Sequence, residues 1–211
     1  MTRLYEWPPT RSNRARWALE ELGMAYESEL VDMPAGEQNS PAYRAVHPLG
    51  VVPALATDGY TMFESVAITM QLIDEHPQCG LAPPVASAER AEYYQWSIFA
   101  AAELDTSLML YFDNTMRPPE AMIPPGTPHN AASAEQGRHA FMNRAQVVSD
   151  VLATQPYMLG DQFSGADIAV GHSCFMATFM NLLEEFPQLV AYYKRLSARP
   201  AHQRTYAQPT G

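Results

Sequence analysis

The 211-residue chain is 47% hydrophobic and 17% charged, so it can bury a core and is not disordered. Its formal net charge of −10 argues against a nucleic-acid-binding protein, which needs a basic face. Neither a basic segment leading into an apolar one at the start nor a run of about 18 apolar residues is present, so we expect no secretory signal and no membrane span.

The first third of the chain alternates strand and helix signals. Apolar residues recur at helical spacing between Arg11 and Leu22, and Gly23 is a natural residue to follow a helix. Asp58-Gly59 is a strong hairpin signal between two short apolar runs. The expected order is β-α-β-α-β-β-α, at residues 3–7, 11–22, 26–31, 40–46, 52–57, 60–62 and 65–75. This order predicts a mixed sheet with helices on its faces.

Residues 78–88 are rich in proline and glycine, which predicts a linker. We therefore expect two domains, an α/β domain at residues 1–77 and an all-α domain at residues 89–211. A proline-rich loop is expected at 117–130, and Pro200 is expected to end the last helix. The predicted helices of the second domain cover residues 88–116, 134–152, 164–180 and 187–197.

Ser164-Gly165-Ala166-Asp167 has the spacing of a capping box, with Asp in place of Glu. We interpret Asp167 as part of this folding element and not as a catalytic acid. The two cysteines, Cys79 and Cys174, lie far apart and form no C-x-x-C motif. Without a secretory signal they fit a reducing cytoplasm, and we expect no metal cofactor.

The segment around Val52-Pro53 and Glu64-Ser65 carries the most informative chemistry. Pro53 lacks an N–H and an X–Pro bond tolerates the cis form, which would turn the N–H and C=O of Val52 toward a ligand. Glu64 and Ser65 add a carboxylate, a hydroxyl and the N–H groups of a helix start. An edge strand with a tolerated proline and a simple helix cap are the structural alternatives. The combination suits a small peptide with both an amino group and a carboxylate.

Six segments, taken together and in order, resemble the cytosolic glutathione S-transferase family, in its bacterial type with a serine or threonine active site. They are residues 17–23 (WALEELG), 47–55 (HPLGVVPAL), 64–65 (ES), 163–169 (FSGADIA), 187–192 (PQLVAY) and 198–201 (ARPA). The resemblance implies a thioredoxin-like N-terminal domain and an all-helical C-terminal domain. It also implies bound glutathione, an apolar electrophilic co-substrate and a homodimer.

The resemblance assigns a role to each residue of the Val52–Ser65 segment. Val52, before the cis-proline Pro53, is expected to pair with the cysteinyl backbone of glutathione. Glu64 and Ser65 are expected to hold its γ-glutamyl end. The glycyl carboxylate is expected to be bound by one of three residues, Gln38, Asn39 or Arg11.

Attack by glutathione needs the thiolate, whereas a free thiol has a pKa of about 8.5. Lowering that pKa by ~2 units requires roughly 2.7 kcal/mol, which a hydroxyl hydrogen bond and a helix N-terminus can supply. The donor is expected between the first strand and the first helix, where Thr10 and Ser12 are the candidates. Ser12 could instead cap the helix. Tyr5, Arg11 and a backbone N–H are further alternatives.

Met109, Phe112 and Met116 end the first long helix and are expected to line an adaptable apolar pocket, with core packing as the alternative. The predicted activity is therefore attack of an activated glutathione thiolate on an electrophilic apolar small molecule. The alternative is a non-catalytic glutathione-binding or regulatory protein on the same fold.

Overall fold

The computed structural model describes residues 1–116 and 130–207, which form two compact units. The first unit comprises residues 1–79 and 199–207, and the second comprises residues 80–116 and 130–198. The domain limits 1–77 and 89–211 stay a prediction. The loop expected at 117–130 lies outside the described residues, apart from Asn130.

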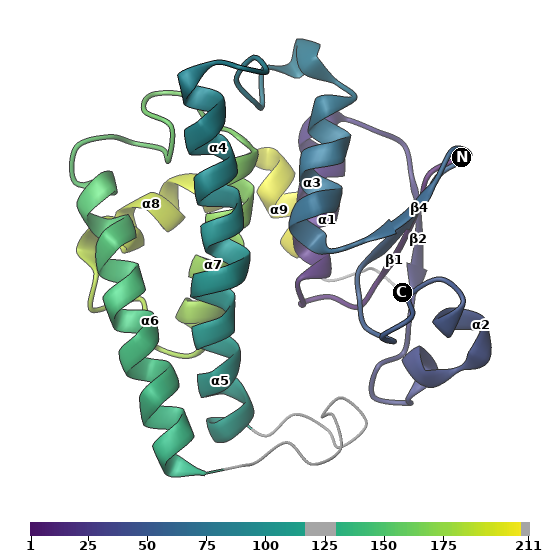
Figure 1. Ribbon diagram of the computed structural model, residues 1–211, viewed down its shortest axis with the longest axis horizontal. Helices are drawn as coiled ribbons and strands as arrows, with labels where there is room; N and C mark the ends of the chain where they lie inside the picture. The colour runs from purple at the N-terminus through teal and green to yellow at the C-terminus, as the bar shows by residue number, and fades with distance from the viewer. Residues whose placement is uncertain (117–129, 208–211) are drawn as a thin grey trace. The chain divides into compact units, whose positions relative to one another are not determined.

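A four-stranded sheet with strand order β2-β1-β3-β4 forms the centre of the first unit (Figure 1). β1 pairs parallel with β2 and antiparallel with β3, and β3 pairs antiparallel with β4, so the predicted mixed sheet is confirmed. The Asp58-Gly59 hairpin is confirmed too, because the N–H of Thr57 donates to the carbonyl of Tyr60 at 2.8 Å. The strands are β1 (Arg3–Glu6), β2 (Glu27–Leu30), β3 (Ala54–Ala56) and β4 (Thr61–Phe63).

Successive residues of β1 point to opposite faces of the sheet. On one face Glu6 forms a buried ion pair with Arg16 of α1 (Ser12–Leu22), and α3 (Ser65–Asp74) packs beside α1 (Figure 1). On the other face the ring of Tyr5 lies 5.9 Å from the ring of Tyr43 in α2 (Pro41–Arg44). The expected order of strands and helices in this unit is therefore correct.

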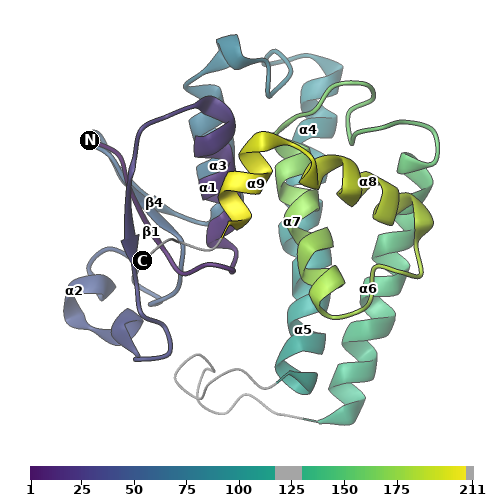
Figure 2. The same cartoon turned by 180° about the vertical axis from the view of Figure 1, so that it is seen from behind.

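The first unit also contains a helix that the sequence analysis missed, α9 (Pro200–Tyr206). The helix expected at 187–197 does end before Pro200, as predicted, since α8 is Pro187–Ser197. Pro200 also begins a further helix, because proline is tolerated at the first position of a helix. α9 lies against α1 (Figure 2). Arg199 donates two hydrogen bonds to Glu21 of α1, at 2.7 and 2.8 Å, and the ring of His202 lies 4.7 Å from that of Trp17.

The second unit is helical, as predicted. α5 and α6 run side by side (Figure 1) and approach closely at Gly137, where a side-chain carbon would lie 2.6 Å from the backbone nitrogen of Tyr111. None of the helices among the described residues is both long and apolar enough to cross a membrane. The helices are α4 (Ala88–Phe99), α5 (Asp105–Thr115), α6 (Ala131–Leu152), α7 (Gly165–Phe179) and α8 (Pro187–Ser197).

The single helix expected at 88–116 is interrupted by a π-helical turn, Ala100–Leu104, between α4 and α5. A π turn carries one residue more than an α turn, and the apolar spacing on either side does not reveal it. Asp105 follows the turn, is 2% exposed, and accepts a hydrogen bond from the Ser173 hydroxyl of α7 at 2.8 Å. The π turn thus sits beside a buried polar contact between two helices.

The capping box predicted at the start of α7 is present. The Asp167 carboxylate accepts hydrogen bonds from the N–H groups of Met158 and Ser164, both at 2.8 Å, and from the Tyr192 hydroxyl at 2.9 Å. The Ser164 hydroxyl donates to it at 3.0 Å. Burial raises the pKa of Asp167 to about 6, although the hydrogen bonds act against this rise. These contacts confirm that Asp167 is a structural residue.

Candidate functional site

Thr10 and Ser12 lie where the loop after β1 enters α1, and their hydroxyl oxygens are 2.8 Å apart. Ser12 is fully buried, whereas Thr10 is partly exposed. The N–H of Ser12 donates to the Thr10 hydroxyl oxygen at 3.2 Å. The two candidate hydroxyls therefore form a pair, with the Thr10 hydroxyl at the accessible end.

The other candidate donors occupy less suitable positions. Tyr5 packs against a hydrophobic cluster on the α2 side of the sheet, formed by Val31, Met33, Tyr43 and Val52. Arg11 directly precedes α1 and is exposed. Neither Tyr5 nor Arg11 takes part in the hydrogen bond between the Thr10 and Ser12 hydroxyls.

The bond between Val52 and Pro53 is cis, as the sequence analysis expected. The Val52 side chain is buried in the hydrophobic cluster, and the carbonyl before it, of Val51, accepts from the Tyr43 hydroxyl at 2.7 Å. Within the described part of the chain no hydrogen bond uses the N–H or the C=O of Val52. This residue can therefore offer one donor and one acceptor to an extended peptide backbone.

Glu64 and Ser65 lie at the start of α3, as predicted. Glu64 is exposed and has a φ of +76°, a left-handed conformation that is unfavourable for a residue other than glycine. Ser65 is buried, and its hydroxyl accepts from the Arg14 guanidinium at 3.5 Å. The helix N-terminus and the buried cation both favour an anion beside Ser65.

Gln38 lies in a 3₁₀ turn, Glu37–Asn39, and is 2% exposed, whereas Asn39 is exposed. The Arg44 guanidinium donates to the Asn39 side-chain oxygen at 3.0 Å. Gly50 has a φ of +60°, and a side-chain carbon there would lie 2.5 Å from the carbonyl oxygen of Gln38. The exposed Arg44 guanidinium of α2 therefore lies beside this turn, bonded to the Asn39 side chain.

Arg44 was not among the residues predicted for the site. A signal was available, because Arg44 is the only Lys or Arg between residues 17 and 89. In a chain of net charge −10, such an isolated guanidinium is a candidate partner for an anion.

Met109, Phe112 and Met116 recur at helical spacing. The first two lie in α5, and Met116 directly follows it. Met109 and Phe112 are half-buried, and Met116 is 40% exposed. Their side chains therefore remain accessible in part, and their role in a pocket stays a prediction.

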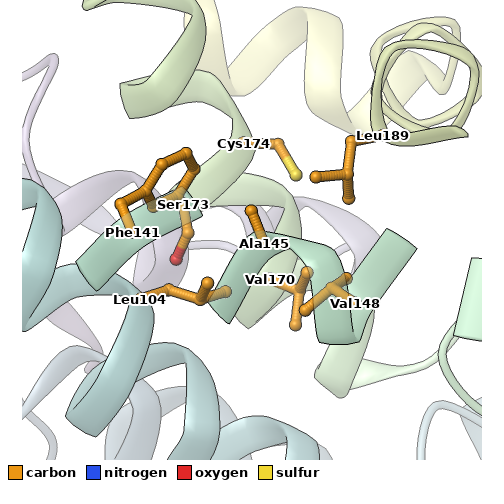
Figure 3. A pocket seen from close by; sticks show the side chains of 8 residues that line it. All are labelled: Leu104, Phe141, Ala145, Val148, Val170, Ser173, Cys174 and Leu189. Atoms are coloured by element: carbon orange, nitrogen blue, oxygen red, sulfur yellow. The ribbon is translucent and has the colours of Figure 1, made fainter. Parts of the chain in front are cut away.

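Cys174 is confirmed as a core residue. It lies beside a cavity of about 10 Å³ between α6, α7 and α8 (Figure 3), and burial raises the pKa of its thiol to about 12. Such a thiol is not a nucleophile at neutral pH. Cys79 is exposed. In residues 1–116 and 130–207, no group of three or more His, Cys, Asp or Glu side chains could hold a metal ion.

A mixed four-stranded sheet with a cis-proline beside β3 and helices on both faces, followed by a helical unit, defines a thioredoxin-like domain joined to an all-helical domain. Two family models match the chain, the glutathione S-transferase N-terminal domain at residues 1–72 and the C-terminal domain at residues 102–200. The chain therefore belongs to the glutathione S-transferase family and is a transferase.

Individual relatives agree with this assignment. Glutathione S-transferase 4 of Zea mays is 30% identical over 201 residues, which cover 90% of this chain and 84% of the relative. A glutathione transferase structure from Methylococcus capsulatus has a TM-score of 0.85 at 27% identity, covering 98% of this chain and 97% of that one. One from Burkholderia graminis, with two glutathione molecules per subunit, has a TM-score of 0.84 at 26% identity, covering 99% and 88%.

Proposed function

We propose that this transferase adds the thiolate of glutathione to an electrophilic apolar small molecule, with Thr10 as the residue that contacts the sulfur. The observation that carries the proposal is the hydroxyl pair at the start of α1, in which Ser12 is fully buried and Thr10 is partly exposed. This corresponds to the serine- or threonine-type active site of the bacterial members that the sequence resembles.

The three parts of glutathione fit three features of the first unit. The backbone of Val52 can pair with the cysteinyl residue, because its N–H and C=O have no other partner among the described residues. The Glu64 carboxylate can meet the γ-glutamyl ammonium. The Ser65 hydroxyl and the start of α3 can receive the γ-glutamyl carboxylate. The glutathione molecules in the Burkholderia graminis structure support this choice of ligand.

The glycyl carboxylate is best matched by the turn around Gln38. Gln38 is buried, whereas the Arg44 guanidinium is exposed and charged and donates to Asn39 and to the carbonyl of Pro48. A carboxylate gains more from a guanidinium than from an amide. We therefore add Arg44 to the three residues expected from the sequence.

The chemistry requires ionisation of the glutathione thiol, whose proton passes to solvent. A hydrogen bond from the Thr10 hydroxyl and the positive end of α1 stabilise the thiolate. With a chlorinated aromatic substrate, the sulfur then forms a bond to the ring carbon, and chloride leaves with the electron pair of the broken C–Cl bond. Each of these steps uses only the residues named above, the two substrates and water.

The apolar substrate is expected to contact Met109, Phe112 and Met116. Two of the three are methionines, whose unbranched side chains adapt to substrates of different shape. We therefore expect the protein to accept a broad range of flat or flexible apolar electrophiles. We also expect it to be located in the cytoplasm.

A homodimer is expected from the surface of α4. Tyr94 and Ile98 are 40% and 54% exposed. They line a shallow groove of about 450 Å³ with Phe99 and Ala102 and with the polar side chains of Gln95 and Glu103. An exposed apolar surface of this kind is typical of an interface between subunits. Sedimentation at micromolar concentration would measure the assembly, and a monomer would contradict this expectation.

Turnover of chlorodinitrobenzene with glutathione tests the role of Thr10. Thr10→Val keeps the shape of the side chain and removes the donor, so we expect kcat/KM at pH 6.5 to fall about 10- to 100-fold. Thr10→Ser should retain most of the rate.

Thr154→Val is the matched control, because Thr154 is exposed and its hydroxyl bonds only within its own turn, to the carbonyl of Val151. It should leave the rate unchanged. An unchanged rate in Thr10→Val would show that another group contacts the sulfur.

A further inference from the structure

The hydroxyl pair at the start of α1 is part of a longer chain of hydrogen bonds. The N–H of Trp7, directly after β1, donates to the Ser12 hydroxyl oxygen at 3.3 Å. The Ser12 hydroxyl lies 2.8 Å from the Thr10 hydroxyl, which also accepts from the Ser12 N–H at 3.2 Å. This series of hydrogen bonds thus begins at the backbone N–H of Trp7 and ends at the hydroxyl of Thr10, a partly exposed residue.

Helix capping does not explain the Ser12 hydroxyl. α1 begins at Ser12 and its preceding cap residue is Arg11, with no side-chain hydrogen bond to the helix start. The partner of the Ser12 oxygen is instead Trp7, five residues earlier. The N–H of Asn13 is used by the carbonyl of Thr10 at 3.0 Å. The Ser12 hydroxyl therefore connects the end of β1 to Thr10 and does not cap the N–H groups in the first turn of α1.

Only one hydrogen can lie between the two hydroxyl oxygens, so the pair has two possible directions. If Thr10 donates to Ser12, the Thr10 hydrogen is used inside the loop and cannot reach a ligand. If Ser12 donates to Thr10, the Thr10 hydrogen is released toward the accessible side. An anion accepts hydrogen bonds only, so a thiolate beside Thr10 requires the second direction.

We propose that Ser12 is a positioning residue, whose hydroxyl donates to Thr10 and thereby directs the Thr10 hydrogen to the glutathione sulfur. The inference rests on the proposed contact between Thr10 and the sulfur. In the directed chain Trp7 donates to Ser12, Ser12 donates to Thr10, and Thr10 donates to the thiolate. Each oxygen that accepts a hydrogen bond becomes a better donor, so the chain strengthens the last bond.

The readout is the pKa of the bound glutathione thiol, measured from the ultraviolet absorbance of the thiolate across pH 5 to 9. The variants are Thr10→Val, Ser12→Ala and the double variant. We expect Thr10→Val to raise this pKa by about 1 to 2 units and Ser12→Ala by about 0.5 to 1 unit. Since Ser12 acts through Thr10, the double variant should match Thr10→Val alone.

Ser12→Thr keeps a hydroxyl and should restore most of the wild-type pKa. Glutathione affinity from calorimetry and a thermal unfolding curve show whether each variant is folded, and the pKa shift is compared only between folded variants. If Ser12→Ala is unstable, Ser12→Cys replaces it, because a thiol is a weak donor of similar size.

The outcomes separate the two proposals. If Thr10→Val raises the pKa and Ser12→Ala does not, the positioning role is wrong and the Thr10 contact stands. An Ser12→Ala effect that adds fully to that of Thr10→Val also contradicts the positioning role, since Ser12 would then act independently. If Thr10→Val leaves the thiol pKa unchanged, both proposals are wrong.

Discussion

Asp167 is a fully buried carboxylate that accepts hydrogen bonds from Met158, Ser164 and Tyr192. Met158 lies in the segment before α7, Ser164 at the start of α7 and Tyr192 in α8, so the carboxylate connects three parts of the second unit. A buried donor that loses its acceptor costs its full desolvation free energy, so such a carboxylate contributes more than one capping bond.

Asp167→Ala is therefore expected to lower the free energy of unfolding by about 3 to 5 kcal/mol, measured by urea denaturation. Tyr192→Phe removes one donor and keeps the ring, and we expect a loss of about 1 kcal/mol. A loss below about 1 kcal/mol in Asp167→Ala would contradict the structural role.

Some residues of the site could be predicted from the sequence and others could not. Val52, Glu64 and Ser65 follow from a local pattern, and the structure places them at a cis-proline and at a helix start. The choice between Thr10 and Ser12 stayed open, because it depends on which residue α1 begins at and on which hydroxyl is buried. Neither property is visible in the spacing of residues.

At the scale of elements, the contact between α5 and α6 depends on the absence of a side chain at Gly137. A carbon there would meet the Tyr111 nitrogen at 2.6 Å and the Ser107 carbonyl oxygen at 3.0 Å. Both atoms are backbone, so they cannot move without shifting a helix. Small residues at such points decide how closely two helices approach.

We expect Gly137→Ala to destabilise the second unit by about 1 to 3 kcal/mol, although alanine is the better helix former. Gly59→Ala is the control, since its new carbon would make only an ordinary contact of 3.9 Å with Thr57. Thermal unfolding measures both changes. A stabilised Gly137→Ala protein would show that α5 and α6 are not packed this tightly.

The order of elements was largely predictable, and the two misses share a cause. α9 was missed because a proline after the end of one helix can also begin another, and the contacts of Arg199 and His202 with α1 hold the second helix in place. The π turn at Ala100–Leu104 was missed because apolar residues continue on both sides of it. In both places tertiary packing decides between local structures that the sequence allows equally.

At the scale of the whole molecule, the last helix of the described chain belongs to the same unit as the first, because α9 packs on α1. His202 is central to this contact, stacked on Tyr206 at 4.2 Å and beside Trp17. Burial lowers the pKa of His202 to about 4, and the nearby Glu21 carboxylate opposes this shift. The folded protein therefore holds a neutral imidazole at neutral pH.

The unfolded chain binds the His202 proton near its ordinary pKa of about 6.5, whereas the folded chain binds it near 4. Between these values the unfolded state carries more protons, so stability falls as the pH drops from 6.5 to 4. We expect the thermal midpoint to fall several degrees further in wild type than in His202→Phe between pH 7 and pH 4.5. Equal falls would show that His202 titrates normally.

The π turn between α4 and α5 sets how the side chains of α5 are rotated relative to those of α4. One residue corresponds to about 100° around a helix, so gain or loss of a single residue there rotates every side chain of α5 relative to α4. Met109, Phe112 and Met116 could then be exchanged for a different set of side chains while the apolar face of α4 stays in place. With the pocket proposed on α5 and the dimer interface proposed on α4, we expect deletion of one residue in this turn to change substrate preference and to leave the proposed dimer unchanged.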